Sequence, residues 1–312
     1  MRIFALRKKE EPLDHAQGIT LYLICCSISS TLTILLKYLA EDISVFQITV
    51  IRGLFALMFF IPIIIKTRAR ILVTPNPKIN LFCGTVTFIS IILWLKAISM
   101  ISAPDATATS FVTPILTTLV AMFILKEKVT RHQWISIMAG FIGMLFIIRP
   151  CFDGGSDLGY FLIIIAGFFT ATSNILVKKM TKNQVPGTIV IYNIFLSVIF
   201  AFPFMMMDYK PIGLNQVFIL ALVGFLISLF YLTKTMAFDK TNVSVVQPFD
   251  FLKLIFTATL SYFVFDQFVD LHTAIGALII VIATSYELRK TRKEKRRREK
   301  EKAKKALVTK HI

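Results

Sequence analysis

Ten apolar stretches, each long enough to cross a bilayer, dominate this sequence of 312 residues. A hydrocarbon core about 30 Å thick requires about 20 apolar residues per helix, and continuous apolar runs favour helices over the alternating strands of a barrel. We therefore expect an all-α polytopic membrane protein with ten transmembrane helices. The stretches cover 18–38, 46–65, 79–98, 104–125, 132–148, 158–178, 187–207, 215–237, 243–265 and 271–288.

Composition excludes two other classes of protein. Apolar residues make up 56% of the chain, and the net charge is +17. Soluble domains average about 45–50% apolar residues and mix their charges throughout, whereas here residues 289–312 alone hold 13 of the 35 basic residues. This pattern excludes an ordinary soluble enzyme and a disordered chain, and it predicts a multi-pass protein of the cell inner membrane.

The distribution of basic residues predicts the orientation. Cations gather on alternate connections, and the opposite connections carry mainly Asp and Glu. Under the positive-inside rule, both termini lie in the cytoplasm, as an even number of spans requires. The cationic set is Arg2, Arg7, Lys8, Lys9, Lys66, Arg68, Arg70, Lys78, Lys126, Lys128, Arg131, Lys178, Lys179, Lys182, Lys234, Lys240 and the basic tail.

An internal repeat divides the chain in two. A shift of 141 lays residues 18–62 on 159–203, and a shift of 140 lays 97–145 on 237–285, both without gaps. Each half holds five spans, and because five is odd the halves must have opposite orientations, an architecture common among secondary transporters. The predicted division is a cytoplasmic segment (1–17), two five-helix repeats (18–149 and 158–289) and a basic cytoplasmic tail (290–312).

Short motifs in both halves resemble the EamA family of the drug/metabolite transporter superfamily. In the first half they are Ala97-Ile-Ser-Met-Ile-Ser-Ala-Pro-Asp-Ala-Thr, Leu125-Lys-Glu and Phe141-Ile-Gly. In the second half they include Ser244-Val-Val-Gln-Pro-Phe, and around Pro248-Phe-Asp-Phe-Leu-Lys-Leu this half most resembles rickettsial-type S-adenosylmethionine uptake carriers. The chain has Asp266-Gln where family members usually have Gly-Glu. The resemblance implies a carrier of small metabolites.

Ionisable side chains within the spans are the first candidates for substrate binding, because such residues are costly in a bilayer and mark pathways or pairs. Asp250 and Lys253 are three residues apart on one helix face and can pair, and Gln247 extends that face. Pro248 interrupts the helix hydrogen bonding beside them. The pair either forms a wall of a central binding cavity or joins two helices structurally.

Five further residues complete the predicted substrate-binding set. Arg52 in the second span either binds a substrate carboxylate or holds Asp105 or Asp250 as a structural partner. Asn193 is its repeat mate and offers a neutral donor and acceptor. Trp94 either anchors at the interface or stacks on a cationic or planar substrate. The set is Arg52, Asp250, Lys253, Asn193, Asn174, Gln247, Asp105 and Trp94.

Other polar residues favour structural roles. Lys37, Lys96 and Lys178 lie near span ends, where they can extend to the interface. A threonine row at Thr109, Thr113 and Thr117 is expected to bond within or between helices. We expect no cofactor, no bound metal and no nucleic acid, and we expect the basic tail to contact anionic lipid headgroups.

Taken together, these features predict a secondary transporter of a small polar or amphoteric metabolite. S-adenosylmethionine uptake is one candidate, and export of amino acids or drugs is the alternative within the family. Two alternatives of other classes are a membrane-embedded enzyme acting on a lipid-linked substrate and a scaffold that acts through its tail. The protein is expected to be a monomer or a homodimer and not an enzyme.

Overall fold

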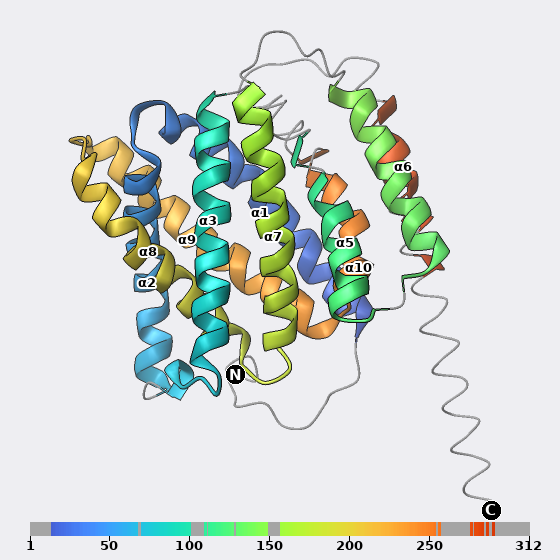
Figure 1. Cartoon of the computed structure of the whole chain (residues 1–312), viewed down its shortest axis with the longest axis horizontal. Coiled ribbons are helices and arrows are strands. Elements are labelled where there is room, and N and C mark those ends of the chain that lie inside the picture. The colour runs from blue at the N-terminus through green and yellow to red at the C-terminus, as the bar shows by residue number, and fades with distance from the viewer. Residues whose placement is uncertain are drawn as a thin grey trace, which may run out of the picture.

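A computed structural model shows a bundle of long helices (Figure 1). It describes residues 14–67, 70–100, 109–110, 112–127, 129–148, 157–253, 255–256, 275–276, 278–283, 285–286 and 289–290. All regular elements among these residues are helical. The helices are α1 (His15–Asp42), α2 (Val45–Lys66), α3 (Pro77–Met100), α5 (Val112–Ile124), α6 (Arg131–Ile148), α7 (Asp157–Met180), α8 (Pro186–Met207), α9 (Leu214–Lys240) and α10 (Val243–Val246), with 3-10 segments η2 (Arg70–Leu72) and η3 (Gln247–Phe251).

Six of these helices are long and apolar enough to cross a membrane: α1, α2, α3, α7, α8 and α9. Each contains one of the predicted spans, and α6 coincides with the span predicted at 132–148. Their outer surfaces are apolar, since Ile65, Met207 and Phe218 are 71%, 85% and 73% exposed. Lipid is the solvent that suits such a surface. The chain is therefore a multi-pass membrane protein.

The predicted ninth and tenth spans are described only in part. The ninth begins as α10 and η3, and Pro248 falls at the start of the 3-10 segment, where the sequence predicted an interruption. Residues 257–265 of that span, and residues 101–108 around the start of the fourth, lie outside the described part of the chain. The count of ten spans therefore stays a prediction.

The helices pack with the symmetry of the predicted repeat. The shifts pair α1 with α7, α2 with α8 and α3 with α9. Helix α1 packs along α9, and its mate α7 packs along α3. Likewise α2 contacts α8 and α9, while α8 contacts α2 and α3. Exchanging the two halves therefore leaves the main contacts among these six helices unchanged.

Two lysines make equivalent contacts in the two repeats. Lys37 Nζ donates to the Ile98 carbonyl near the end of α3 at 2.8 Å. Its repeat mate Lys178 donates to the Phe238 and Thr241 carbonyls at the end of α9, at 2.5 and 2.7 Å. Carbonyls at helix ends lack partners in their own helix, so both lysines cap a neighbouring helix. The expectation that they extend to the membrane interface was wrong, because each lysine instead donates to carbonyls at the end of a neighbouring helix.

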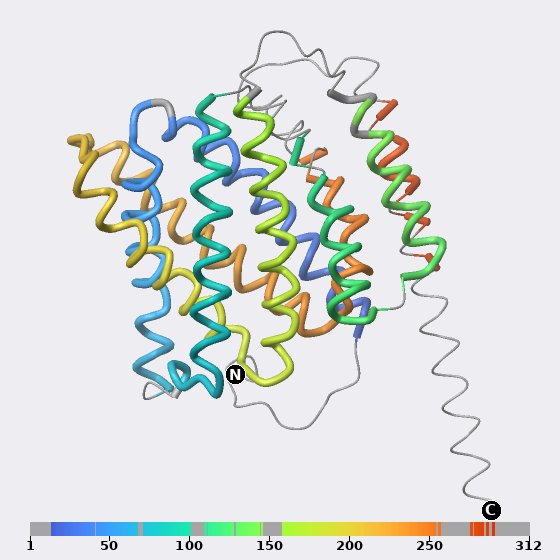
Figure 2. Tube along the Cα trace, viewed as in Figure 1, coloured from blue at the N-terminus to red at the C-terminus, as the bar shows by residue number. Residues whose placement is uncertain are grey.

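Thr241 also shows that α1 and α7 run in opposite directions (Figure 2). Its backbone carbonyl accepts from Nζ of Lys178, which lies in the last turn of α7. Its hydroxyl also lies 2.6 Å from Nδ1 of His15, the first residue of α1. The start of α1 and the end of α7 are thus on the same side of the bundle, as inversion of one repeat relative to the other requires.

Candidate functional site

A cavity of about 250 Å³ lies in the middle of the bundle. Its lining comes from α1, α2, α3 and α5 of the first repeat, and from α7, α9 and the η3 segment of the second. Neither half encloses this space by itself. A molecule in the cavity would therefore contact both repeats at once.

The one described carboxylate in the lining belongs to Asp250, on η3. Lys253 Nζ lies 2.8 Å from its Oδ1, so the predicted pairing of these two residues is confirmed. The Tyr22 hydroxyl, on α1, donates to the same oxygen at 2.8 Å. Both contacts use Oδ1, and neither uses Oδ2. The cluster links α1 of the first repeat to η3 of the second.

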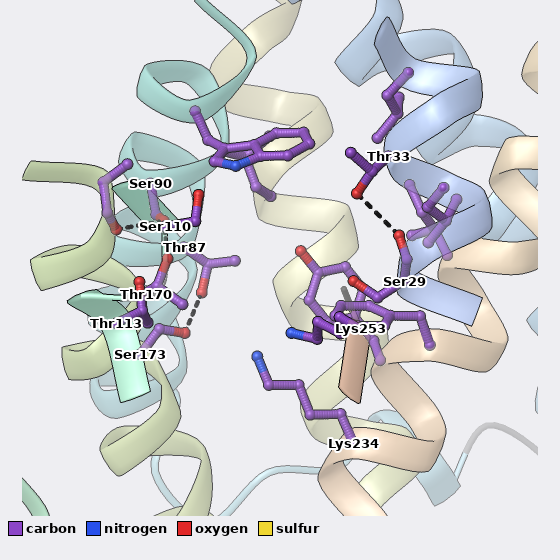
Figure 3. A pocket seen from close by; sticks show the side chains of 18 of the residues that line it. Ser29, Thr33, Thr87, Ser90, Ser110, Thr113, Thr170, Ser173, Lys234 and Lys253 are labelled. Carbon is purple, nitrogen blue, oxygen red and sulfur yellow. Dashed lines mark hydrogen bonds between the residues drawn. The ribbon is translucent and has the colours of Figure 1, made fainter. Parts of the chain in front are cut away.

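Hydroxyl groups form the opposite wall of the cavity (Figure 3). Ser90 and Thr170 pair across α3 and α7 at 2.5 Å, and Thr87 and Ser173 pair at 2.7 Å. Figure 3 shows this row facing the side from which Lys234 and Lys253 project. Small hydroxyls that already satisfy one another leave space, and they can still accept or donate to a ligand.

Arg52 and Lys234 supply two more positive charges to the cavity lining. Arg52 is 6% exposed, and no contact within the described part of the chain gives its guanidinium a hydrogen bond or an ion pair. The suggested partner Asp250 instead holds Lys253. Lys234 lies over the rings of Phe230 and Phe238, with Nζ 5.5 and 5.9 Å from their centroids.

The position of Lys234 corrects the sequence analysis, which counted it with the cytoplasmic connections. Its side chain lines the central cavity from within α9, which continues to Lys240. Proximity to the end of an apolar stretch suggested an interfacial lysine. The helix extends beyond that stretch, so Lys234 lies deeper than its position in the sequence suggested.

Five of the eight predicted binding residues line the cavity: Arg52, Trp94, Asn174, Asp250 and Lys253. Asn193 and Gln247 are buried outside the lining, and among the described residues neither Oδ1 of Asn193 nor either amide atom of Gln247 has a hydrogen-bond partner. Asp105 lies outside the described residues. The sequence analysis missed Tyr22, Lys234, Tyr231 and the hydroxyl pairs. For α7, the four-residue spacing between Thr170 and Asn174 was the feature of the sequence that could have indicated a polar helix face.

The EamA-like transporter family model matches this chain twice, at residues 16–149 and 157–286. The chain belongs to this family. The resemblance noted in the sequence is thus confirmed in both halves.

Curated relatives and a solved structure cover most of the chain. An S-adenosylmethionine uptake transporter of Rickettsia prowazekii is 26% identical over 276 residues, covering 87% of this chain and 92% of that protein. A riboflavin transporter of Vibrio cholerae is 30% identical over 213 residues, covering 66% and 71%. A crystal structure with 12% sequence identity has a TM-score of 0.75 and covers 88% of this chain and 98% of that one. The last similarity shows the fold alone.

One residue of the EamA motifs, Glu127, joins the two repeats at the end of α5. Its Oε1 accepts from the Val243 amide at 3.2 Å, and its Oε2 accepts from the Ser244 amide and hydroxyl at 3.1 and 2.8 Å. The preceding residue, Lys126, has a positive φ of 53°, a conformation that costs a non-glycine residue about 1–2 kcal/mol. A carboxylate at the start of α10 satisfies amides that lack partners within the helix.

Proposed function

We propose that this EamA-family protein is a secondary carrier that moves a small polar metabolite across the bacterial inner membrane by alternating access. In this proposal, ten helices form two inverted five-helix repeats, 18–149 and 158–289, and both termini lie in the cytoplasm. The segments 1–17 and 290–312 flank the repeats, and the basic tail contacts anionic lipid. Opposite directions of α1 and α7 support the inversion.

The observation that carries this proposal is a charged cavity shared by both repeats. Rocking one repeat against the other would expose such a site to each side of the membrane in turn. Because one chain supplies the whole lining, transport requires no second copy, and the protein would act as a monomer or as a homodimer of independent carriers. No bound cofactor or metal enters the proposal, and the protein is proposed not to be an enzyme.

An amphoteric substrate fits the charges of the lining. The planar guanidinium of Arg52 suits a carboxylate, and Oδ2 of Asp250, which neither Lys253 nor Tyr22 contacts, would accept from an ammonium group. The hydroxyl wall and Trp94 would contact the remainder of the molecule. Asn174 would add an amide, while Asn193, Gln247 and Asp105 remain proposed contributors from outside the described lining.

S-adenosylmethionine is the substrate that we propose to test first, since it carries a carboxylate and an ammonium group and is the named substrate of the rickettsial relatives. Riboflavin, named for other relatives, has neither group and would leave the buried charges of this cavity unmatched. Amino acids, moved in either direction, are the remaining alternative.

Uptake of labelled S-adenosylmethionine into proteoliposomes containing the purified chain tests the proposal. We expect saturable uptake that increases when unlabelled compound is preloaded inside. Asp250→Asn and Arg52→Gln should each reduce uptake at least about tenfold, because each removes a charge-assisted contact. Unchanged kinetics in both folded variants would refute the assigned residues. Turnover of a substrate in detergent without any gradient would instead indicate an enzyme.

A further inference from the structure

Lys234 is the cavity residue that an amphoteric substrate leaves unexplained. Its ammonium group has two aromatic faces beside it, but no described carboxylate pairs with it. The described carboxylate in the same lining, Asp250, already receives contacts from Lys253 and Tyr22. Aromatic faces attract a cation by about 0.5–2 kcal/mol, which is less than the cost of removing an ammonium group from water.

The described lining carries more positive than negative charge. Arg52, Lys234 and Lys253 are cationic, and Asp250 is the one carboxylate. Lys253 and Asp250 compensate each other at 2.8 Å, which leaves Arg52 and Lys234. These two residues come from opposite repeats, since Arg52 is on α2 and Lys234 is on α9. A cavity inside a bilayer concentrates the effect of such charges, because the surrounding dielectric constant is low.

We propose that Lys234 forms an anion subsite for a carboxylate or phosphate group of the substrate, and that the negative groups of the substrate at least balance its positive ones. The preferred substrate is then neutral overall or anionic. Its negative charge would complete an electrostatic link between the repeats through Lys234 on one side and Arg52 on the other. An occupied cavity would be better compensated than an empty one, which favours movement of the repeats with substrate bound.

This inference rests on the proposed carrier function and makes it more specific, because it predicts that S-adenosylmethionine, with two positive groups and one carboxylate, is a weaker ligand than a neutral or anionic relative of it. S-adenosylmethionine has a sulfonium charge, and S-adenosylhomocysteine lacks that charge and one methyl group but is otherwise the same molecule. With an excess of positive charge in the lining, the second compound should bind more tightly than the first. The two compounds therefore form a matched pair that differs mainly in net charge.

Ligand-induced shifts of the thermal unfolding midpoint of the full chain in detergent, at low salt, test the subsite. Three matched pairs serve as probes: S-adenosylhomocysteine and S-adenosylmethionine, glutamate and glutamine, and glycerol 3-phosphate and glycerol. Within at least one pair, we expect the more negative member to bind at least about tenfold more tightly. The glutamate and phosphate arms distinguish a carboxylate from a phosphate ligand.

Three variants locate the preference. Lys234→Met should lose it, Lys234→Arg should retain it, and Lys96→Met should leave it unchanged, because Lys96 is exposed outside the cavity. No shift with any negative member, no charge preference in the wild type, or the same preference in Lys234→Met would each overturn the subsite. Uptake of S-adenosylmethionine alongside such a result would keep the carrier and reject only the subsite. A charge preference without any uptake would keep the subsite and reject the carrier function.

Discussion

The contact between Glu127 and the start of α10 gives the sharpest test of how the two repeats are joined. Glu127 belongs to the first repeat, whereas Val243 and Ser244 belong to the second. Val243 and Ser244 are 0% and 1% exposed, so the groups that donate to Glu127 could not form hydrogen bonds with water instead. Replacing Glu127 by Ala removes three hydrogen bonds at once.

The magnitude follows from the three bonds. Each of the two amide contacts resembles a helix cap, which contributes about 1 kcal/mol. The Ser244 hydroxyl donates to a carboxylate oxygen at 2.8 Å, a charge-assisted bond of about 1.5 kcal/mol. Glu127→Ala should therefore destabilise the protein by about 3.5 kcal/mol, and the thermal unfolding midpoint in detergent should fall by roughly 5–10 °C.

Two milder substitutions separate the contributions. Glu127→Gln keeps one acceptor oxygen and should cost about half as much as Glu127→Ala. Ser244→Ala removes one bond and should cost about 1.5 kcal/mol. In the double variant Glu127→Ala/Ser244→Ala, the costs should fall short of additivity by about 1 kcal/mol or more. Additive costs, or a Glu127→Ala midpoint equal to that of the wild type, would refute the reasoning.

Three further substitutions test other contacts. Lys178→Met should destabilise the protein by about 2–3 kcal/mol, because it leaves two carbonyls at the end of α9 unpartnered. Lys37→Met should cost less, because it leaves only the Ile98 carbonyl without this partner, and the thermal unfolding midpoints of the two variants measure the difference. Gly224→Ala should be destabilising by about 1–3 kcal/mol, since its Cβ would lie 2.6 Å from the Arg52 carbonyl. Gly213→Ala meets nothing within 4 Å and should cost only the loss of a glycine N-cap, about 0.5 kcal/mol. Tyr22→Phe should fold normally but reduce uptake about tenfold, because Asp250 loses a hydrogen bond; unchanged uptake would show that this contact does not matter for transport.

Local features of the sequence were sufficient to predict much of the fold. Apolar stretches placed the long helices within a few residues, because the bilayer selects for length and composition rather than for detailed packing. The pair formed by Asp250 and Lys253 followed from a spacing of three residues and the cost of burying either charge alone. Pro248 indicated where regular helix would stop, and η3 begins beside it.

Contacts between distant segments could not be predicted in the same way. Tyr22 reaches Asp250 across 228 positions of sequence, and nothing in the neighbourhood of either residue indicates the other. The hydroxyl groups were equally ambiguous, because Thr33 bonds back to its own helix at Ser29 whereas Ser90 bonds across to Thr170. The choice between these outcomes depends on which face of a helix meets a neighbour, and apolar stretches in a membrane do not reveal that face.

The repeat allows the two sides of the cavity to be compared position by position, and equivalent positions differ in chemistry. A shift of 140 relates lining positions of the first repeat to lining positions of the second. The pairs are Trp94 and Lys234, Ser110 and Asp250, and Thr113 and Lys253. Equivalent backbone positions thus present an aromatic ring and hydroxyls on one side, and three ionisable groups on the other. Symmetric helices place these positions around one cavity, but the side chains have diverged. A substrate with a charged end and a neutral polar end would consequently bind in one orientation, with its charges toward Arg52 on α2 and the charged residues of α9 and η3.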